Sequence, residues 1–216
     1  MDLNCEQVQV ILHVRRGVLM SREFHFSEED RSRTIEKLIL ERRTIHEYTN
    51  ESVPKEIWLK ALEMATWAQN HKLSQPWRFI HIQRGSRERM IELAIEVRNR
   101  KSLLSGAETE SLRARYNSVP ILIAVAQQKS MSFEQQREDY GAIACGLQNA
   151  SLYLAALGFG SKWSTGELIQ YPKTAEVLGV LKSEELIGFY WIGRPARIPA
   201  PPLRQPIMNF VRESGP

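Results

Sequence analysis

Residues 119–126 form a continuous apolar run, Val-Pro-Ile-Leu-Ile-Ala-Val-Ala, and this run constrains the fold more than any other segment. Its length is that of a strand, and a strand with apolar side chains on both sides is typical of the centre of a sheet that is covered on both faces. The sequence around it has the apolar spacing of several helices. We therefore predict an α+β fold in which helices dominate.

The spacing of apolar residues predicts the other elements. Two further strands are expected, at residues 79–83 and 186–193. Helices are expected at residues 34–41, 54 to about 69, 86–100, 134–157 and 172–178. Residues 108–116 fit either a helical turn or a mobile connection, and residues 163–166 fit a loop.

The longest predicted helix, residues 134–157, has a face of small and apolar side chains. That face comprises Ala142, Ile143, Gly146, Leu147, Ala150, Leu154 and Ala155. Small residues allow close helix packing, so we expect this face to contribute to a homodimer. Gly158 follows the helix and is expected to cap it in the left-handed conformation.

The two ends of the chain differ from its centre. Residues 1–33 are interpreted as an N-terminal extension of uncertain structure, in which Val8 to Val14 give a weak strand signal. Residues 34–216 are interpreted as one domain that ends in a C-terminal arm. The arm is proline-rich from Arg194 and is not expected to form a regular element before about Ile207.

Composition excludes several functional classes. The net charge is +4, but Lys and Arg are interleaved with Asp and Glu, which argues against a nucleic-acid footprint. No run is long and apolar enough to span a bilayer. The two cysteines lack metal-ligand spacing and indicate a reduced, cytoplasmic protein, with Cys145 expected to be a small buried hydrophobe. No Ser/His/Asp or Cys/His arrangement for nucleophilic catalysis is present.

The segment Gln75-Pro76-Trp77 places an amide, a fixed turn and a large aromatic between a helix and a strand. Arg42 and Arg43 end the helix predicted at residues 34–41, one helix earlier. Guanidinium groups bind phosphate through paired hydrogen bonds, and an amide can match the acceptor-rich edge of a heteroaromatic ring. The pattern indicates a site that holds a phosphate at one end and a flat ring at the other, although two arginines can also simply complement a helix dipole.

Four motifs occur in chain order between the expected elements. They are Arg42-Arg43-Thr44, Asn70-His71 with Gln75-Pro76-Trp77-Arg78-Phe79, Leu157 to Gly166, and Gly188 to Pro195. Together they resemble the nitroreductase family of FMN-dependent oxidoreductases, and especially its short bacterial NAD(P)H nitroreductases with a His-Lys-x-x-Gln-Pro-Trp turn. The resemblance covers residues 34–193. It implies a mostly antiparallel central sheet wrapped by helices, and an interlocked homodimer with two FMN sites at the subunit interface.

The resemblance also implies roles for individual residues. Arg42, Arg43 and Thr44 would hold the FMN phosphate and ring edge from one subunit. His71 and Gln75 would reach the flavin from the other subunit, although His71 also fits a helix cap. The segment Trp163-Ser164-Thr165-Gly166 would line the ring, with a backbone N–H near N5, although Trp163 fits a loop anchor equally well. Arg194 would be a second phosphate ligand.

One position departs from the family pattern. Relatives usually carry Lys or Arg two residues after the Thr44 position, near the flavin N1/O2 edge, and this chain has His46. An imidazole would stabilise anionic reduced flavin less than a fixed cation does. The flavin itself would carry the chemistry, so the resemblance requires no catalytic side chain.

The implied activity is NAD(P)H-dependent reduction of electron-poor small molecules, such as nitroaromatics or quinones, by ping-pong hydride transfer. Acceptor choice would lie in a variable segment around residues 101–118. One alternative is a non-catalytic flavin-binding or nucleotide-sensing protein on the same fold. Another is an enzyme that fragments flavin or dehalogenates its substrate, but the turn sequences of such enzymes differ from this one.

Overall fold

The computed structural model describes residues 27–215, so the weak strand signal at Val8 to Val14 lies outside the described residues. The chain divides after Lys37 into two units, and helix α1 (Glu28–Glu41) begins in the first unit and ends in the second. The helix starts six residues earlier than predicted. Its start is capped, because the backbone N–H of Asp30 donates to Ser27 Oγ (3.1 Å). No helix in the described part of the chain has both the length and the apolar content to cross a membrane.

The second unit is built on a four-stranded sheet in which all neighbouring strands are antiparallel. Its strands are β1 (Trp77–His81), β2 (Ile121–Gln128), β3 (Gly160–Ser164) and β4 (Glu184–Gly193), in the spatial order β1-β2-β4-β3. β2 lies between two neighbours, and seven of its eight residues are buried. The apolar run therefore forms a central strand, as predicted.

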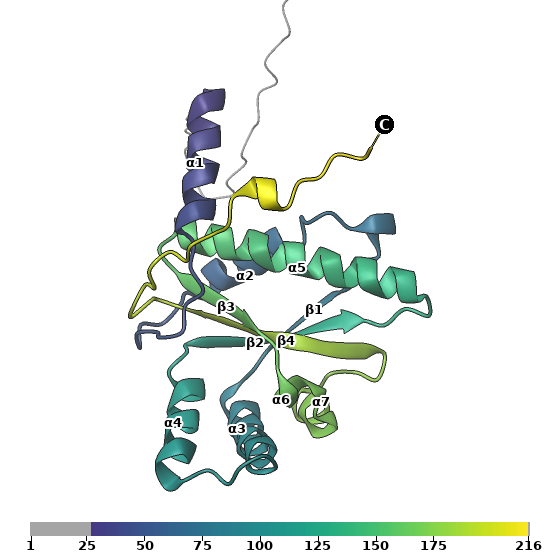
Figure 1. Ribbon diagram of the computed structural model, residues 1–216. Coiled ribbons are helices and arrows are strands. Elements are labelled where there is room, and N and C mark those ends of the chain that lie inside the picture. The colour runs from purple at the N-terminus through teal and green to yellow at the C-terminus, as the bar shows by residue number, and fades with distance from the viewer. Residues whose placement is uncertain (1–26, 216) are drawn as a thin grey trace, which may run out of the picture. The chain divides into compact units, whose positions relative to one another are not determined.

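Helices cover both faces of the sheet (Figure 1). One face packs against α2 (Lys55–Ala65) and α5 (Phe133–Ala156), and the other against α3 (Arg84–Asn99), α4 (Gly106–Asn117), α6 (Glu167–Gln170) and α7 (Pro172–Leu178). Successive residues of β2 enter opposite cores: Ile123 packs with α2 and α5, and Leu122 with the helices on the other face. Two short 3₁₀ turns, η1 (His71–Leu73) and η2 (Ile207–Asn209), complete the fold. The α+β prediction is confirmed.

The small-residue face of α5 packs within its own chain. A Cβ atom placed on Gly146 would lie 2.5 Å from the carbonyl oxygen of Ala65, so α2 crosses α5 at nearly backbone contact. Most of the predicted face is buried there, while Ala155 is half-buried. Close helix packing was therefore predicted correctly, but its partner is α2, and this face cannot also be the contact surface of a homodimer.

Other local predictions were also wrong, and strand β1 lies two residues earlier than the predicted range 79–83. Residues 160–164 form strand β3, although a loop had been predicted for Trp163 and Ser164. The strand was missed because the segment Gly-Ser-Lys-Trp-Ser has little intrinsic strand preference. It gains its structure by pairing with β4. Cys145 is exposed on α5, where the register of the buried face turns it outward. Helix α2 ends at Ala65 rather than near residue 69.

Candidate cofactor and acceptor site

The free edge of β3 is covered by the segment that follows α1. Thr44 forms a parallel bridge with Ser161, and the backbone N–H of Ile45 donates to the Ser161 carbonyl (3.1 Å). A Cβ atom on Gly160 would overlap the Ile45 side chain, so glycine is what permits this close approach. The contact places the first motif beside the third, as a site shared by these two motifs requires.

Arg194 belongs to the same neighbourhood. Its carbonyl accepts a hydrogen bond from the Thr49 backbone N–H (2.9 Å), and its Nε donates to Glu51 Oε1 (2.8 Å). The guanidinium carbon lies 4.5 Å from the centroid of the Phe159 ring. The charge of Arg194 is thus already paired, and a phosphate would have to compete with Glu51 for it.

The two adjacent arginines differ in what they contact. Arg43 Nη1 donates to the carbonyls of Leu40 (2.5 Å) and Arg42 (2.8 Å), so this side chain caps the C-terminal end of α1. Arg42 is half-buried, and its guanidinium has no hydrogen bond or ion pair with any residue in 27–215. Burial raises the pKa of the neighbouring Tyr190 hydroxyl to about 12, against smaller opposing effects that include the Arg42 charge. Arg42 therefore offers a free cation, whereas Arg43 has a structural role.

Lys162, which the sequence did not single out, is a charged residue buried beside the site. It is only 4% exposed, and its Nζ has no hydrogen-bond partner among residues 27–215. The ammonium lies 4.0 Å from the centroid of the Trp191 ring. Burial, and then the charge of Arg115, lower the pKa of Lys162 to about 8. The residue lies in the strand that the sequence had not revealed, so its burial could not have been anticipated.

His46 lies close to this lysine. Partial burial lowers the pKa of His46, the charges of Lys162 and Arg115 lower it further, and Glu47 opposes them. His46 is therefore mainly neutral at pH 7. The position where relatives carry a cation is thus occupied by a neutral ring with two other cations nearby.

Side chains alternate along β3, so the residues predicted to line the ring face in different directions. The Trp163 ring lies 5.8 Å from the ring of Tyr140 on α5, and its Nε1 is buried without a hydrogen-bond partner among the described residues. Ser164 faces the opposite side, where its Oγ accepts a hydrogen bond from Trp191 Nε1 (2.8 Å). Gly188 is required beside Trp163, because a Cβ atom there would overlap the indole.

A cavity of about 460 Å³ lies on the Ser164 side of the sheet. Thr165 and Gly166 form part of its wall, and α3 and α4 close it from the other side. Its lining combines aromatic side chains with basic ones, namely Tyr116, Phe189, Trp191, Arg98, Lys101 and Arg115, together with Glu167. Helix α4, in the segment expected to select the acceptor, thus contributes directly to a cavity beside the predicted flavin contacts.

The Gln75-Pro76-Trp77 turn has an unusual backbone. Lys72, Leu73 and Gln75 all have positive φ, at 57°, 50° and 47°. Such conformations cost about 1–3 kcal/mol each in non-glycine residues and persist only where the surroundings impose them. Here Asn70 Oδ1 accepts from the Gln75 backbone N–H (2.7 Å), and Ser74 Oγ donates to Asp139 Oδ1 on α5 (2.5 Å).

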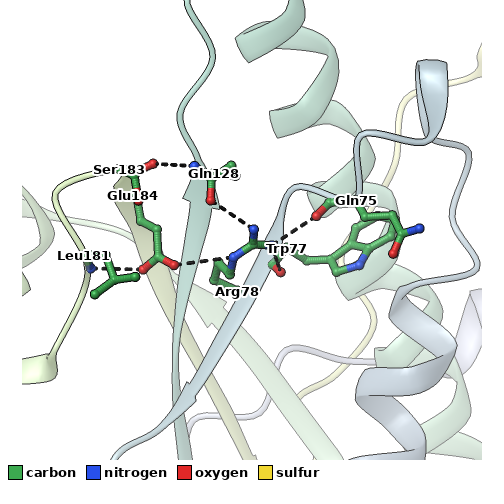
Figure 2. Close-up of polar contacts among 7 residues, drawn as sticks. All are labelled: Gln75, Trp77, Arg78, Gln128, Leu181, Ser183 and Glu184. Atoms are coloured by element: carbon green, nitrogen blue, oxygen red, sulfur yellow. Dashed lines mark hydrogen bonds and ion pairs between the residues drawn. The ribbon is translucent and has the colours of Figure 1, made fainter.

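Arg78 fixes the other end of this turn (Figure 2). Its Nη1 donates to the carbonyls of Gln75 (3.1 Å) and Trp77 (3.0 Å), and its Nη2 donates to Gln128 Oε1 (2.9 Å). Its Nε lies 3.4 Å from Oε1 of the buried Glu184. The turn is thus held from both sides, and the side chains of His71 and Gln75 remain exposed. Trp77 packs against the core instead.

Thr44 and the Gln75-Pro76-Trp77 turn, two parts of the predicted site, lie toward opposite ends of the sheet. Ser161, beside Thr44, is paired with Ile192, whereas Trp77 is aligned through Gln127 with Glu185. These positions are seven residues apart along β4, which corresponds to roughly 23 Å. Thr44 and the turn of one chain therefore lie too far apart to hold one small ring between them. Ser164 is closer to the turn, since its partner Phe189 is four residues from Glu185.

Comparison with known proteins identifies the family. YfhC of Bacillus subtilis (strain 168), which is named as an NAD(P)H nitroreductase, is 25% identical to this chain over 178 residues. The match covers 82% of this chain and 92% of YfhC. A nitroreductase-like family protein from Bacillus cereus has a TM-score of 0.73 and 28% identity, covering 83% of this chain and 95% of that one. The FMN-dependent nitroreductase NfnB from Mycobacterium smegmatis, solved with NADPH, has a TM-score of 0.66 at 18% identity, covering 86% and 100% of the two chains, and shows the shared fold. The model of the Nitroreductase family matches residues 39–194, and the chain belongs to that family.

Proposed function

We propose that this protein is an FMN-dependent oxidoreductase that uses NAD(P)H to reduce electron-poor small molecules. The observation that carries the proposal is a pair of donors beside β3 that have no hydrogen-bond partner among residues 27–215: the guanidinium of Arg42 and the indole N–H of Trp163. Buried donors without partners are costly, and an anionic, acceptor-rich cofactor would satisfy them. The NAD(P)H nitroreductase name of YfhC and the FMN-dependent activity in the name of NfnB support the same chemistry.

Different residues of the chain would bind different parts of FMN. Arg42 would bind the FMN phosphate, and Thr44 would present its hydroxyl to the cofactor from the edge of β3. The backbone N–H groups near Thr165 and Gly166 would face the ring. His71 and Gln75 of a second copy would complete the site, because the same residues of one chain lie far from its own Thr44.

When bound, FMN would supply hydride transfer from NAD(P)H to the acceptor. The protein would hold donor and acceptor in turn in one binding place, as a ping-pong scheme requires. The test is the absorbance spectrum of the purified protein, followed by anaerobic addition of NADH or NADPH. A yellow protein that bleaches and regains its colour with a nitroaromatic supports the enzyme. A yellow protein that does not bleach supports a non-catalytic flavin-binding protein instead.

Arg42→Ala is expected to weaken FMN binding by about tenfold to a hundredfold, because a hydrogen bond to a charged group contributes about 1.5–3 kcal/mol. Arg43→Ala is the matched control: its guanidinium is bonded to backbone carbonyls, so its loss should lower stability more than FMN affinity. Fluorescence titration of the apoprotein with FMN measures both dissociation constants. Equal affinities for the wild type and Arg42→Ala would remove Arg42 from the phosphate site.

We also expect a homodimer, assembled so that one copy's turn reaches the other copy's β3. Besides the separation of the two half-sites, the C-terminal arm supports this. Its large apolar side chains are exposed, namely Ile198, Leu203, Ile207, Met208, Phe210 and Val211. An arm of this kind would bury them against a second copy. Light scattering at low concentration tests the expectation, and a stable monomer that keeps its FMN would contradict it.

A further inference from the structure

The cavity beside Thr165 and Gly166 has an excess of positive charge. Four charged side chains line it: Arg98, Lys101, Arg115 and Glu167. Lys101 and Glu167 form an ion pair with each other, so they cancel. Arg98 and Arg115 make no ion pair with any residue in 27–215. The charge left for a ligand is therefore entirely positive.

Lys162 adds a third cation next to this wall. Its ammonium and the Arg115 guanidinium both lie over the Trp191 ring, at 4.0 and 5.8 Å from the centroid. Trp191 lines the cavity, and Ser164, which shares a strand face with Lys162, lines it as well. Two cations that share one aromatic ring attract it but repel each other. A buried ammonium without a hydrogen-bond partner beside a second cation is an unfavourable arrangement unless an anion binds there.

The remaining lining indicates the shape of that anion. Tyr116, Phe189 and Trp191 supply aromatic surface, and Ala94, Val97 and Leu112 supply aliphatic surface. The volume of about 460 Å³ is in the range of cavities that hold one small organic molecule. An inorganic anion would neutralise the positive charge but would leave this apolar surface in contact with water.

We propose that this cavity binds the acceptor and that it selects a planar aromatic carboxylate, with the carboxylate near Arg115 and Lys162 and the ring beside Trp191 and Tyr116. The proposal rests on the proposed reductase function and specifies its substrate class. Helix α4 supplies Leu112, Arg115 and Tyr116, so the selectivity belongs to the segment that connects α3 to β2.

Two isosteric acceptors test the proposal in the holoenzyme: 4-nitrobenzoate, which is an anion, and 4-nitrobenzamide, which is neutral. The wild type is expected to have a kcat/KM about tenfold to a hundredfold higher for the anion, mainly through KM, since charged hydrogen bonds are involved. Arg115→Gln and Lys162→Met should each remove most of this preference, because KM for the anion should rise far more than KM for the amide. Arg113→Gln is the matched control, because Arg113 lies on the same helix and pairs with Glu92 outside the cavity.

A binding measurement separates this proposal from the reductase function. Benzoate and benzamide cannot be reduced at a nitro group, and their binding is followed by tryptophan fluorescence. Benzoate should bind the wild type at least tenfold more tightly than benzamide, and Arg115→Gln should abolish the difference. Equal reduction of the two nitro compounds, or equal binding of the two unreactive analogues, overturns the anion preference while the reductase function stands. Tight benzoate binding without any nitro reduction supports the anion site and contradicts the reductase function.

Discussion

Replacing Lys162 with methionine should stabilise the protein at pH 7 by about 2–3 kcal/mol. The pKa of Lys162 is lowered from 10.5 to about 8 in the folded protein, chiefly by burial. A difference of one pKa unit corresponds to about 1.4 kcal/mol, so the folded state holds this charge at a considerable cost. Methionine keeps the length of the side chain and its contact with Trp191 but carries no charge. For a chain of this size the midpoint of thermal unfolding should rise by about 5–10 °C.

The gain should depend on pH in a defined direction. Below pH 8 the lysine is protonated in both the folded and the unfolded protein, so the full cost is present. Between pH 8 and 10.5 the unfolded chain keeps the proton that the folded chain has lost, and the natural protein becomes more stable relative to the variant as pH rises. The groups that face Lys162 are Arg115, His46 and, beyond it, Glu47. None of them has its ordinary pKa in this window.

Thermal unfolding of both proteins between pH 6 and 10, at one protomer concentration and without carboxylate buffers, measures the difference. Burial raises the pKa of Tyr190 to about 12, and its ionisation changes the stability of both proteins equally above pH 10, so it does not alter the difference between them. Lys182→Met serves as the control, since Lys182 is exposed and its loss should change stability by less than about 0.5 kcal/mol. A Lys162→Met protein that is less stable than the wild type at pH 7 would show that the ammonium has a partner.

Asp139→Ala should have the largest destabilising effect at the predicted site. Asp139 is 3% exposed and accepts hydrogen bonds from Ser74 Oγ (2.5 Å) and Gln135 Nε2 (2.9 Å). Its removal breaks two hydrogen bonds to a charged carboxylate, which contribute about 1.5–3 kcal/mol each before the donors rebind water. It also frees a turn whose left-handed residues persist only while neighbours hold them. We expect a loss of about 2–4 kcal/mol and FMN binding weakened at least tenfold.

Limited proteolysis with trypsin detects the loosened turn without relying on the cofactor. Cleavage after Lys72, inside the turn, should become at least tenfold faster in Asp139→Ala. Glu138→Ala is the neighbouring control, because Glu138 is exposed and its side chain makes no hydrogen bond or ion pair with any residue in 27–215. Asp139→Asn, which keeps one acceptor oxygen, should lie between the two. An Asp139→Ala protein that is cleaved as slowly as the wild type would show that Arg78 and Asn70 suffice to hold the turn.

The sequence predicted the architecture because its signals were local. The apolar run of β2 and the spacing in α5 each reflect burial of a whole element, and burial is what these patterns record. Strand β3 was missed because Gly160 to Ser164 carries no such pattern: it forms a strand only through its hydrogen bonds with β4. The identity of the family followed from motifs that this missing strand did not disturb.

The chemistry of the site was predicted less completely, for the same reason. Arg42 and Arg43 are neighbours in sequence and look equivalent, yet one caps a helix and the other is free, a difference that only packing creates. Lys162 became notable only once β3 was seen to turn it inward onto Trp191. Asp139 lies 65 residues from Ser74, and no local pattern could have paired them.

The bridge between Thr44 and Ser161 has a consequence for how the protein behaves without its cofactor. β3 is an outer strand of the sheet, and residues 44–45 occupy its open side with backbone hydrogen bonds. An open strand side is a template for pairing with other chains, and proteins avoid aggregation by covering it. The segment that covers it here also carries Arg42 and His46. A protein that has lost the ligand of these residues would therefore be the form that precipitates, so added FMN should protect against aggregation as well as support activity.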